Sequence, residues 1–164
     1  MEREISAGGV VVRPGAEGWE VAVIEPQREP AAGTAKGKRW QKMLLALPKG
    51  LVDAGEKAEQ TAVREVAEET GLAAAYEAKL GDIKYVYVRS WGDKQRVFKI
   101  VSFYLLRYQA GTIDEIAPEM RIEVKRALWI PLEEAERKLA YKGERDMVRR
   151  ACEYLQAHSA ASPS

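Results

Sequence analysis

The sequence predicts a single α/β domain, and three observations support this fold class. The chain has 164 residues, a length that fits one domain with a sizeable core. Several runs with strong β-propensity are followed or separated by segments with helical spacing of apolar residues. No internal repeat is present that would indicate a solenoid or another repeat architecture. We therefore expect one domain over residues 1–157 and a small, polar, disordered tail over residues 158–164.

Composition narrows the classes of function. The formal net charge is +1 and charged residues make up 31% of the chain, so no global field favours nucleic acid or an anionic membrane as a partner. The single cysteine, Cys152, excludes an intramolecular disulfide framework and a cysteine-based metal site. No apolar leader segment and no run of membrane-spanning length is present, so a cytoplasmic location is expected. The only histidine, His158, falls in the predicted tail and is not expected to be catalytic.

The first third of the chain predicts a hairpin and a long loop. Residues 3–12 and 19–25 are strand-like and are separated by a turn at 14–18. The Gly8-Gly9 pair in the first of them allows a close backbone approach or a bulge. Residues 26–42 contain Pro, Gly and five basic residues with little periodicity, which indicates a loop. Its basic side chains either help to hold a polyanionic substrate or are only solvated. A short strand is expected at residues 44–47.

The second half of the chain predicts four more strands and two helices. Strands are expected at 73–79, 83–89 and 96–107, the last two forming a hairpin around a turn at 90–94. An acidic loop covers 108–121 and a short strand covers 128–131. Helical spacing then covers 132–139, and a last helix runs from 142 or 143 to about 157.

Residues 50–72, GLVDAGEKAEQTAVREVAEETGL, are the most informative stretch. Residues 57–70 predict a helix, because they lack internal Gly and Pro, are rich in Ala and Glu, and are followed by Gly71. At about 100° per residue, one face is formed by Val63, Val66, Ala67 and Thr70. The acids Glu65, Glu68 and Glu69 are expected on the opposite face. Carboxylates at this spacing repel one another by about 0.2 to 0.5 kcal/mol per exposed pair.

A divalent cation would turn this repulsion into attraction. Carboxylate oxygens suit Mg²⁺ or Mn²⁺, and Mg²⁺ usually takes its remaining ligands from water and substrate phosphates. Gly50 and Gly55 allow a tight loop that brings the backbone and Glu56 toward the same metal face. Arg64 can orient a neighbouring carboxylate by a forked ion pair. The alternative is an ordinary solvated surface helix rich in Ala and Glu.

The complete spacing resembles the Nudix box, G-x5-E-x7-R-E-U-x-E-E-x-G-U with U aliphatic, at every specified position. The seven fixed and two aliphatic positions are Gly50, Glu56, Arg64, Glu65, Val66, Glu68, Glu69, Gly71 and Leu72. This resemblance implies an α/β/α sandwich with a mixed, curved β-sheet between helices. It also implies a pyrophosphohydrolase that needs Mg²⁺ or Mn²⁺ and directs water at a phosphorus of a diphosphate linkage. The linkage would belong to a nucleoside diphosphate joined to another group.

The resemblance also implies roles for individual residues. The implied metal ligands are Glu65, Glu68 and Glu69, together with Gly50 and Glu56 of the preceding loop. Arg64 is the implied orienting residue. The general base is either a box glutamate, Glu65 or Glu68, or a downstream glutamate, with Glu123 preferred over Glu119. Lys49 abuts the metal loop and Lys99 matches the family's Lys-x-Val-x-aromatic pattern, so both are expected to contact phosphate.

Substrate choice within the family follows from weaker signals. Tyr85 and Tyr87 stand in a region where the dinucleoside polyphosphate branch carries a base-stacking aromatic residue, although ordinary strand packing would also explain them. A diadenosine polyphosphate is therefore the expected substrate. A nucleoside triphosphate, ADP-ribose or a nucleotide sugar remains an alternative, and so does a catalytically silent nucleotide-binding module. Either a monomer or a homodimer is compatible with the sequence.

Overall fold

The structure is a computed structural model that describes residues 2–27, 44–89, 92 and 94–159. The expected basic loop at 26–42 lies almost entirely outside the described residues, and so do Ser90, Trp91 and Asp93 of the expected turn. The predicted tail is described only as far as Ser159.

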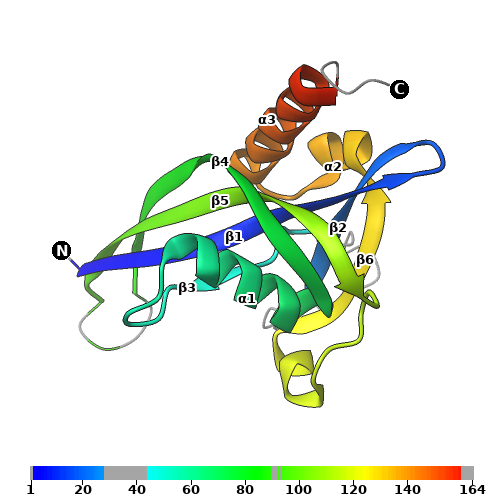
Figure 1. The fold of residues 1–164 in the computed structure, drawn as a ribbon. Coiled ribbons are helices and arrows are strands. Elements are labelled where there is room, and N and C mark those ends of the chain that lie inside the picture. The colour runs from blue at the N-terminus through cyan, green and yellow to red at the C-terminus, as the bar shows by residue number, and fades with distance from the viewer. Residues whose placement is uncertain (1, 28–43, 90–91, 93, 160–164) are drawn as a thin grey trace, which may run out of the picture.

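Six strands form one mixed sheet at the centre of the molecule (Figure 1). They are β1 (Glu2–Gly15), β2 (Gly18–Pro26), β3 (Lys49–Leu51), β4 (Leu72–Val88), β5 (Arg96–Gly111) and β6 (Val124–Pro131). The order is β4-β5-β1-β2-β6, and β3 pairs with the first half of β1. The β1 and β5 strands are parallel, whereas every other pair is antiparallel. Both predicted hairpins, β1 with β2 and β4 with β5, are confirmed.

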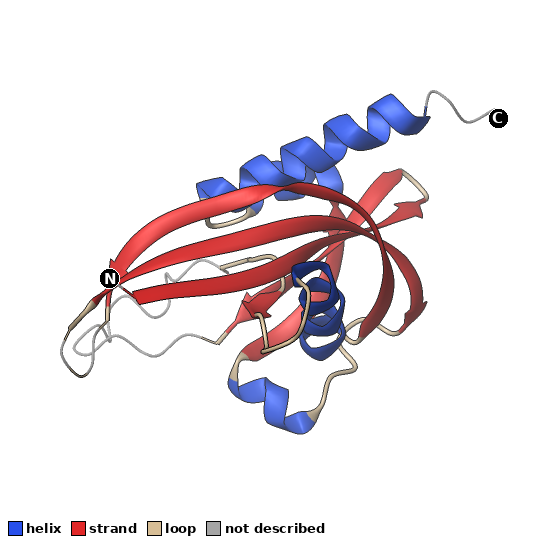
Figure 2. Ribbon diagram, turned by 60° about the vertical axis from the view of Figure 1, so that its left-hand side comes forward, coloured by secondary structure: helices blue, strands red, loops and turns tan. Residues whose placement is uncertain are grey.

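Helices cover both faces of this sheet (Figures 1 and 2). The box helix α1 (Ala58–Thr70) packs on one face. The opposite face carries α2 (Leu132–Lys138) and α3 (Lys142–Ser159). A short 3₁₀ helix, η2 (Pro118–Ile122), precedes β6. The expected α/β/α sandwich is therefore confirmed, and none of the described helices is both long and apolar enough to cross a membrane.

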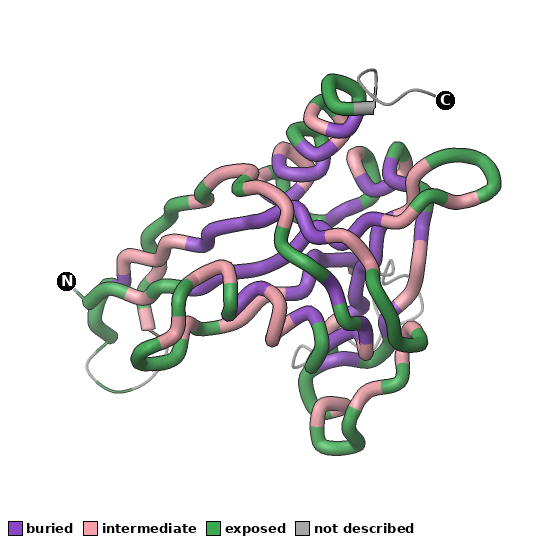
Figure 3. Tube along the Cα trace, in the orientation of Figure 1, coloured by how far each residue is buried: buried purple, intermediate pink, exposed green. Residues whose placement is uncertain are grey.

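The strand period divides the core into two layers. On β1, Val10 and Val12 pack with Phe103 of β5 in the layer beneath α2 and α3. Ala7 and Val11 point the other way and pack beneath α1. Successive side chains of a strand point to opposite faces, so one apolar run supplies both layers. Figure 3 shows this continuous buried stretch of the central strands.

Three predicted elements differ from the observed ones. The two strands expected at 73–79 and 83–89 are one strand, β4, because the pairing to β5 continues past Gly81. Three register shifts along β4 accommodate its irregularities. The strand expected at 44–47 lies at 49–51 instead, and Leu45 and Ala46 form only isolated bridges. The last helix extends to Ser159, so His158 lies in its final turn rather than in a tail.

The predicted faces of α1 also need correction. Glu69 is buried at 7% exposure, whereas Ala67, expected on the apolar face, is exposed. At about 100° per residue, Glu69 lies only about 60° around the helix from the buried Val66. Glu69 therefore belongs to the packed side of the helix, and only Glu65 and Glu68 turn away from the core.

Candidate active site

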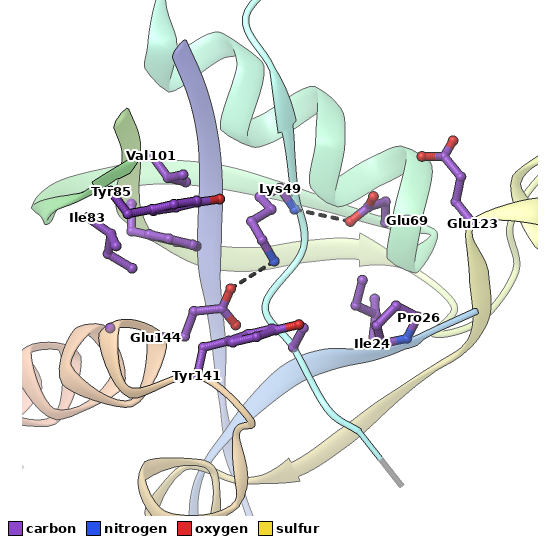
Figure 4. A pocket seen from close by; sticks show the side chains of 13 residues that line it. Ile24, Pro26, Lys49, Glu69, Ile83, Tyr85, Val101, Glu123, Tyr141 and Glu144 are labelled. Atoms are coloured by element: carbon purple, nitrogen blue, oxygen red, sulfur yellow. Dashed lines mark hydrogen bonds and ion pairs between the residues drawn. The ribbon is translucent and has the colours of Figure 1, made fainter. Parts of the chain in front are cut away.

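Two neighbouring cavities lie where β3 leaves the sheet. The larger cavity, of about 580 Å³, is bounded by β2, β4, β5 and the start of α3, and its polar lining residues include Lys49, Glu69, Glu123 and Glu144 (Figure 4). The smaller cavity, of about 340 Å³, is lined by parts of β1, β3 and α1. Lys49 and Glu123 line both cavities, so they stand at the boundary between them.

A close approach of two chain segments creates this boundary. The backbone N–H of Gly9 donates to Pro48 O at 3.1 Å, and a Cβ added to Gly8 would lie 2.5 Å from the same oxygen. A side chain at Gly8 would therefore push the segment before β3 away from β1. The close backbone approach expected at the Gly8-Gly9 pair is confirmed.

Gly50 has a similar role one strand away. A Cβ added to Gly50 would overlap the carboxyl group of Glu65. The Glu65 side chain therefore lies directly over the β3 backbone, at a position that only glycine leaves open. Gly50, Glu65 and Glu68 all line the smaller cavity.

Arg64 ties the loop before α1 to the acids of the helix. Its guanidinium contacts both carboxylate oxygens of Glu56, at 2.9 and 3.0 Å, and Glu65 Oε2 at 2.9 Å. It also donates to both oxygens of Glu68, at 3.2 and 3.1 Å, and to Leu51 O at 3.1 Å. Five N–H donors in a planar fork allow one arginine to hold several carboxylates at once.

Glu56 is fully occupied by this arrangement. Besides Arg64, its Oε1 accepts the Thr61 hydroxyl at 2.6 Å and the Asp53 N–H at 3.2 Å. Arg64 and then Thr61 lower the pKa of Glu56 to about 2. Glu56 lines neither cavity, so the geometry makes it the anchor of Arg64 and does not support its predicted role as a metal ligand.

Glu69 has a different environment, although it belongs to the same acidic group. Its Oε1 accepts the backbone N–H of Lys49 at 3.0 Å. Burial is the main cause that raises the pKa of Glu69 to about 8, and the charges of Glu65 and Glu123 raise it further. Burial likewise raises the pKa of Glu65, with Glu68 and Glu123 contributing. Four carboxylates therefore act on one another across the two cavities.

The charges and positions of these carboxylates show whether the residues fit a metal ion. Among the described residues, no group of three or more His, Cys, Asp or Glu side chains is arranged so that it could hold a metal ion. The oxygen donors nevertheless match Mg²⁺ chemistry, and burial, with the charges of neighbouring glutamates added to it, raises the pKa of both Glu65 and Glu69. Arg64 compensates Glu65 and Glu68, but its contacts do not include Glu69. The donor set therefore fits a divalent cation, provided that Glu65 and Glu68 turn partly away from Arg64.

Only one of the two downstream glutamates, Glu123 and Glu119, lies at the cavities. Glu123 lines both cavities, and no described residue hydrogen-bonds to its carboxylate. Its backbone ends the η2 turn through an N–H that donates to Met120 O at 2.9 Å. Glu119 lies in η2 and lines neither cavity. The structure thus brings the preferred downstream glutamate, and not the second choice, to the site.

Three of the four predicted substrate contacts line a cavity. Lys49 and Tyr85 line the larger one, and Lys99 lines the smaller one, with its ammonium 3.8 Å from Glu4. Tyr87 lines neither, and its hydroxyl bonds with Glu4. Since Tyr85 and Tyr87 share a face of β4 with ring centroids 6.3 Å apart, Tyr87 packs beside the predicted stacking residue rather than in the cavity.

Tyr141 and Glu144 were not among the predicted site residues. Tyr141, 53% exposed, lines the larger cavity from just before α3, facing Tyr85 from the other side of Lys49 (Figure 4). Glu144 is buried at 3% exposure and lies 2.8 Å from the Lys49 ammonium. Only the contacts in space between α3 and the segment at 47–49 bring these two side chains to the cavity.

Comparison with known proteins identifies the family of the chain. The NUDIX domain family matches residues 3–151. The chain belongs to this family, and the resemblance seen in residues 50–72 is confirmed.

Two relatives share substantial identity with the chain. "Putative mutator protein MutT4" of Mycobacterium tuberculosis (strain CDC 1551 / Oshkosh) is 38% identical over 161 residues, which cover 98% of this chain and 59% of that protein. "Putative 8-oxo-dGTP diphosphatase" of Bacillus subtilis (strain 168) is 50% identical over 62 residues, which cover 37% of this chain and 39% of that protein. The chain therefore spans less than two thirds of the length of either relative.

Solved structures share the fold. A C. elegans Ap4A hydrolase in a binary complex superposes with a TM-score of 0.68 at 20% identity, covering 94% of this chain and 98% of that one. The NUDIX domain of Shewanella oneidensis NrtR, complexed with ADP ribose, has a TM-score of 0.62 at 21% identity and covers 94% of this chain and 90% of that one. At these identities the likeness shows the fold alone.

Proposed function

We propose that this protein is a metal-dependent pyrophosphohydrolase. Its reaction is the attack of water on a phosphorus of a diphosphate linkage, and its substrate is a nucleoside-diphosphate-linked compound, with a diadenosine polyphosphate preferred. One observation carries this proposal: Glu65, Glu68, Glu69, Glu123 and Lys49 meet at two adjoining cavities. Acids that repel one another beside a lysine fit a site that binds cations and phosphates together.

The metal would be held by Glu65, Glu68 and Glu69, with the backbone of Gly50 beside them. When bound, Mg²⁺ or Mn²⁺ supplies charge neutralisation at the phosphate oxygens and lowers the pKa of a coordinated water. Arg64 orients Glu65 and Glu68 in this scheme, and Glu56 in turn fixes Arg64. The acids therefore keep their places when no cation compensates them.

Glu123 is the proposed general base. Its carboxylate lines both cavities and accepts no hydrogen bond from the described residues, so its oxygens can take up a proton. Glu65 and Glu68 are both engaged by Arg64. A general base must reach the attacking water directly or through one other water. Glu65 and Glu68 remain the alternatives, because each can accept a proton once Arg64 releases it.

The preferred substrate follows from the aromatic side chains of the larger cavity. Tyr85 and Tyr141 are both about half exposed and lie on opposite sides of the Lys49 side chain (Figure 4). Two such rings can bind a flat base by stacking, while Lys49 and Lys99 bind successive phosphates. A C. elegans Ap4A hydrolase has the same fold, so this fold can carry a site for such a substrate.

A nucleoside triphosphate is the second candidate substrate. The names of the two relatives, a mutator protein and an 8-oxo-dGTP diphosphatase, favour it. ADP-ribose or a nucleotide sugar is a third, since the NrtR domain of this fold was solved with ADP ribose. A catalytically silent nucleotide-binding module would keep the cavities but show no turnover.

The decisive experiment is product analysis on a substrate panel with Mg²⁺ or Mn²⁺. The panel contains diadenosine tetraphosphate, ADP-ribose, a nucleotide sugar, nucleoside triphosphates and their 8-oxo forms. Release of ATP and AMP from diadenosine tetraphosphate is the expected result, and it should disappear on chelation of the metal. Nucleoside monophosphate and pyrophosphate formed preferentially from a triphosphate would favour the second candidate. Nucleotide binding with no turnover of any substrate would support the silent module.

A further inference from the structure

The ammonium group of Lys49 is held from two sides before any substrate is present. Its Nζ donates to Leu47 O at 3.0 Å and lies 2.8 Å from Glu144 Oε2. Figure 4 shows Glu144 in the first turn of α3 pointing toward Lys49. An ammonium has three N–H donors, so two of them point at protein oxygens and one is left for the cavity.

Glu144 holds the backbone of the same segment as well as its side chain. Its Oε1 accepts the N–H of Leu47 at 2.8 Å, while Oε2 pairs with Lys49. The carboxylate is only 3% exposed, and Leu47 is completely buried. One buried carboxylate thus fixes both the position of residues 47–49 and the direction of the Lys49 side chain.

Joining α3 to the sheet through this ion pair has a high desolvation cost. Removing charged groups from water is unfavourable, and apolar side chains of similar volume often stabilise a protein equally well. The surrounding cavity is apolar enough for them, with Ile83, Val101 and Phe103 in its lining. The Lys49 side chain, however, stays 30% exposed on the cavity side. The arrangement therefore favours a role in the cavity over a role in packing alone.

We propose that Glu144 is a positioning residue for substrate binding, which orients the Lys49 ammonium toward a phosphate of the bound diphosphate. This inference rests on the proposed function. Lys49 in turn donates its backbone N–H to Glu69, so Glu144 aligns the phosphate-facing lysine with the proposed metal-binding acid through one residue. Lys49 is the residue that contacts substrate, and Glu144 acts through it.

The test is a double-mutant cycle with inorganic pyrophosphate as the ligand, because every candidate substrate contains a diphosphate. Binding to the full chain is measured by calorimetry with Mg²⁺ present for wild type, Glu144→Gln, Lys49→Met and the double variant. Glutamine can still accept the Leu47 N–H, but it removes the charge that holds Lys49. We expect Glu144→Gln to weaken pyrophosphate binding about tenfold, the usual scale of a lost hydrogen bond to a charged group. The double variant should bind no more weakly than Lys49→Met alone.

Glu25→Gln is the matched control for burying an uncharged amide in place of a carboxylate. Glu25 is 8% exposed and pairs with Arg126 at 3.0 Å, but it lines neither cavity. Its replacement should leave pyrophosphate affinity unchanged. Thermal unfolding of every variant separates altered binding from loss of fold.

An independent readout follows the ammonium itself. In a nitrogen-detected NMR spectrum of the lysine ammonium groups, the Lys49 signal should be that of an immobilised ammonium in wild type. In Glu144→Gln it should be that of a rotationally averaged ammonium, with or without ligand. An ordered Lys49 signal in Glu144→Gln would overturn the inference even if that variant were too unstable for calorimetry. Additive losses in the cycle, or wild type that binds no pyrophosphate, would overturn it too. Wild type that binds pyrophosphate with the expected cycle but hydrolyses nothing would count against the proposed function only.

Discussion

The acids of α1 are held in two different ways. Glu65 and Glu68 share one guanidinium, that of Arg64, which reduces their mutual repulsion. Glu69 instead accepts a backbone N–H, which lowers its pKa, but burial and then the charges of Glu65 and Glu123 outweigh this and raise the pKa of Glu69 to about 8. A cation would have more effect on Glu69 than on the other two, since its charge is compensated least.

Glu69→Gln is therefore expected to remove most turnover while leaving the fold intact. Glutamine keeps the size of the side chain and an oxygen for the Lys49 N–H, and it removes only the charge. We expect kcat to fall by about 100-fold, at the upper end of losses seen for residues that support a metal. Steady-state kinetics and thermal unfolding measure the two effects.

Glu59→Gln provides the control for that variant. Glu59 lies in the first turn of the same helix and lines neither cavity, so its replacement should change neither turnover nor metal dependence. Wild-type kcat in Glu69→Gln would contradict the assignment of Glu69 to the metal.

The positions of some site residues could be predicted from the sequence, and those of others could not. The spacing from Gly50 to Leu72 was sufficient to predict the acids, Arg64 and the terminating Gly71. The burial of Glu69 follows from the same helical wheel but was missed, because its charge suggested the solvent side. Glu144 could not be predicted, since its role depends on contact between α3 and a segment 97 positions earlier in the chain.

At the scale of elements, strand β3 and helix α1 pack more closely than they could if Gly50 carried a side chain. Gly50 leaves room for the Glu65 carboxyl group over β3, and Leu51 O accepts from Arg64. The helix also ends at Gly71, which adopts a left-handed φ of 84°. The short strand therefore acts as a support for the acids rather than as a main part of the sheet.

Gly50→Ala tests this close packing. The added methyl group would overlap the Glu65 carboxyl group, so either Glu65 or β3 must move. We expect kcat/KM to fall by about 10- to 100-fold, as for other changes that displace groups supporting a metal. The free energy of unfolding should fall by about 1 to 3 kcal/mol, the usual cost of overpacking.

Gly15→Ala is the matched substitution at the far end of the sheet. A Cβ there would also approach a glutamate side chain, that of Glu20, at 2.9 Å, but in the β1–β2 hairpin. It should leave kcat/KM unchanged. Equal activity of the two variants would show that the position of Glu65 does not limit the reaction.

Secondary structure was predictable where local chemistry decides it. The helix over α1 and both hairpins follow from spacing, glycine and β-propensity. The break expected within β4 does not occur, because pairing with β5 continues through the irregularities and Gly81 adopts a φ of 157° without leaving the strand. The exact place of β3 depends on its register with β1, which local sequence does not encode.

At the scale of the whole molecule, the acids of the site link stability to pH and to metal. In the folded protein Glu69 retains its proton up to a pKa of about 8, whereas the unfolded carboxyl group releases it near 4.5. The folded state therefore binds more protons than the unfolded state between these values. The free energy of unfolding must consequently fall as the pH rises from about 4.5 to about 8.

Chemical denaturation across this pH range checks the expectation. In metal-free protein the fall should be at least about 1 kcal/mol, because one unit of pKa shift corresponds to about 1.4 kcal/mol. Saturating Mg²⁺ should reduce the slope by stabilising the charged carboxylates. Glu69→Gln should flatten it without metal, and an unchanged slope in that variant would contradict the role given to Glu69. Glu56 has a lowered pKa, so its stabilising contribution is constant across this range and is lost only as the pH falls below about 4.5.

The parallel pairing of β1 with β5 has a consequence for how the chain folds. Glu2 pairs with Val97 and Val12 with Arg107, so the central strand of the sheet finds one neighbour only after most of the chain exists. Contacts between such distant segments slow folding. During synthesis the β1–β2 hairpin leaves the ribosome with one edge open and apolar. Until β5 covers it, we expect that unpaired edge to be prone to aggregation.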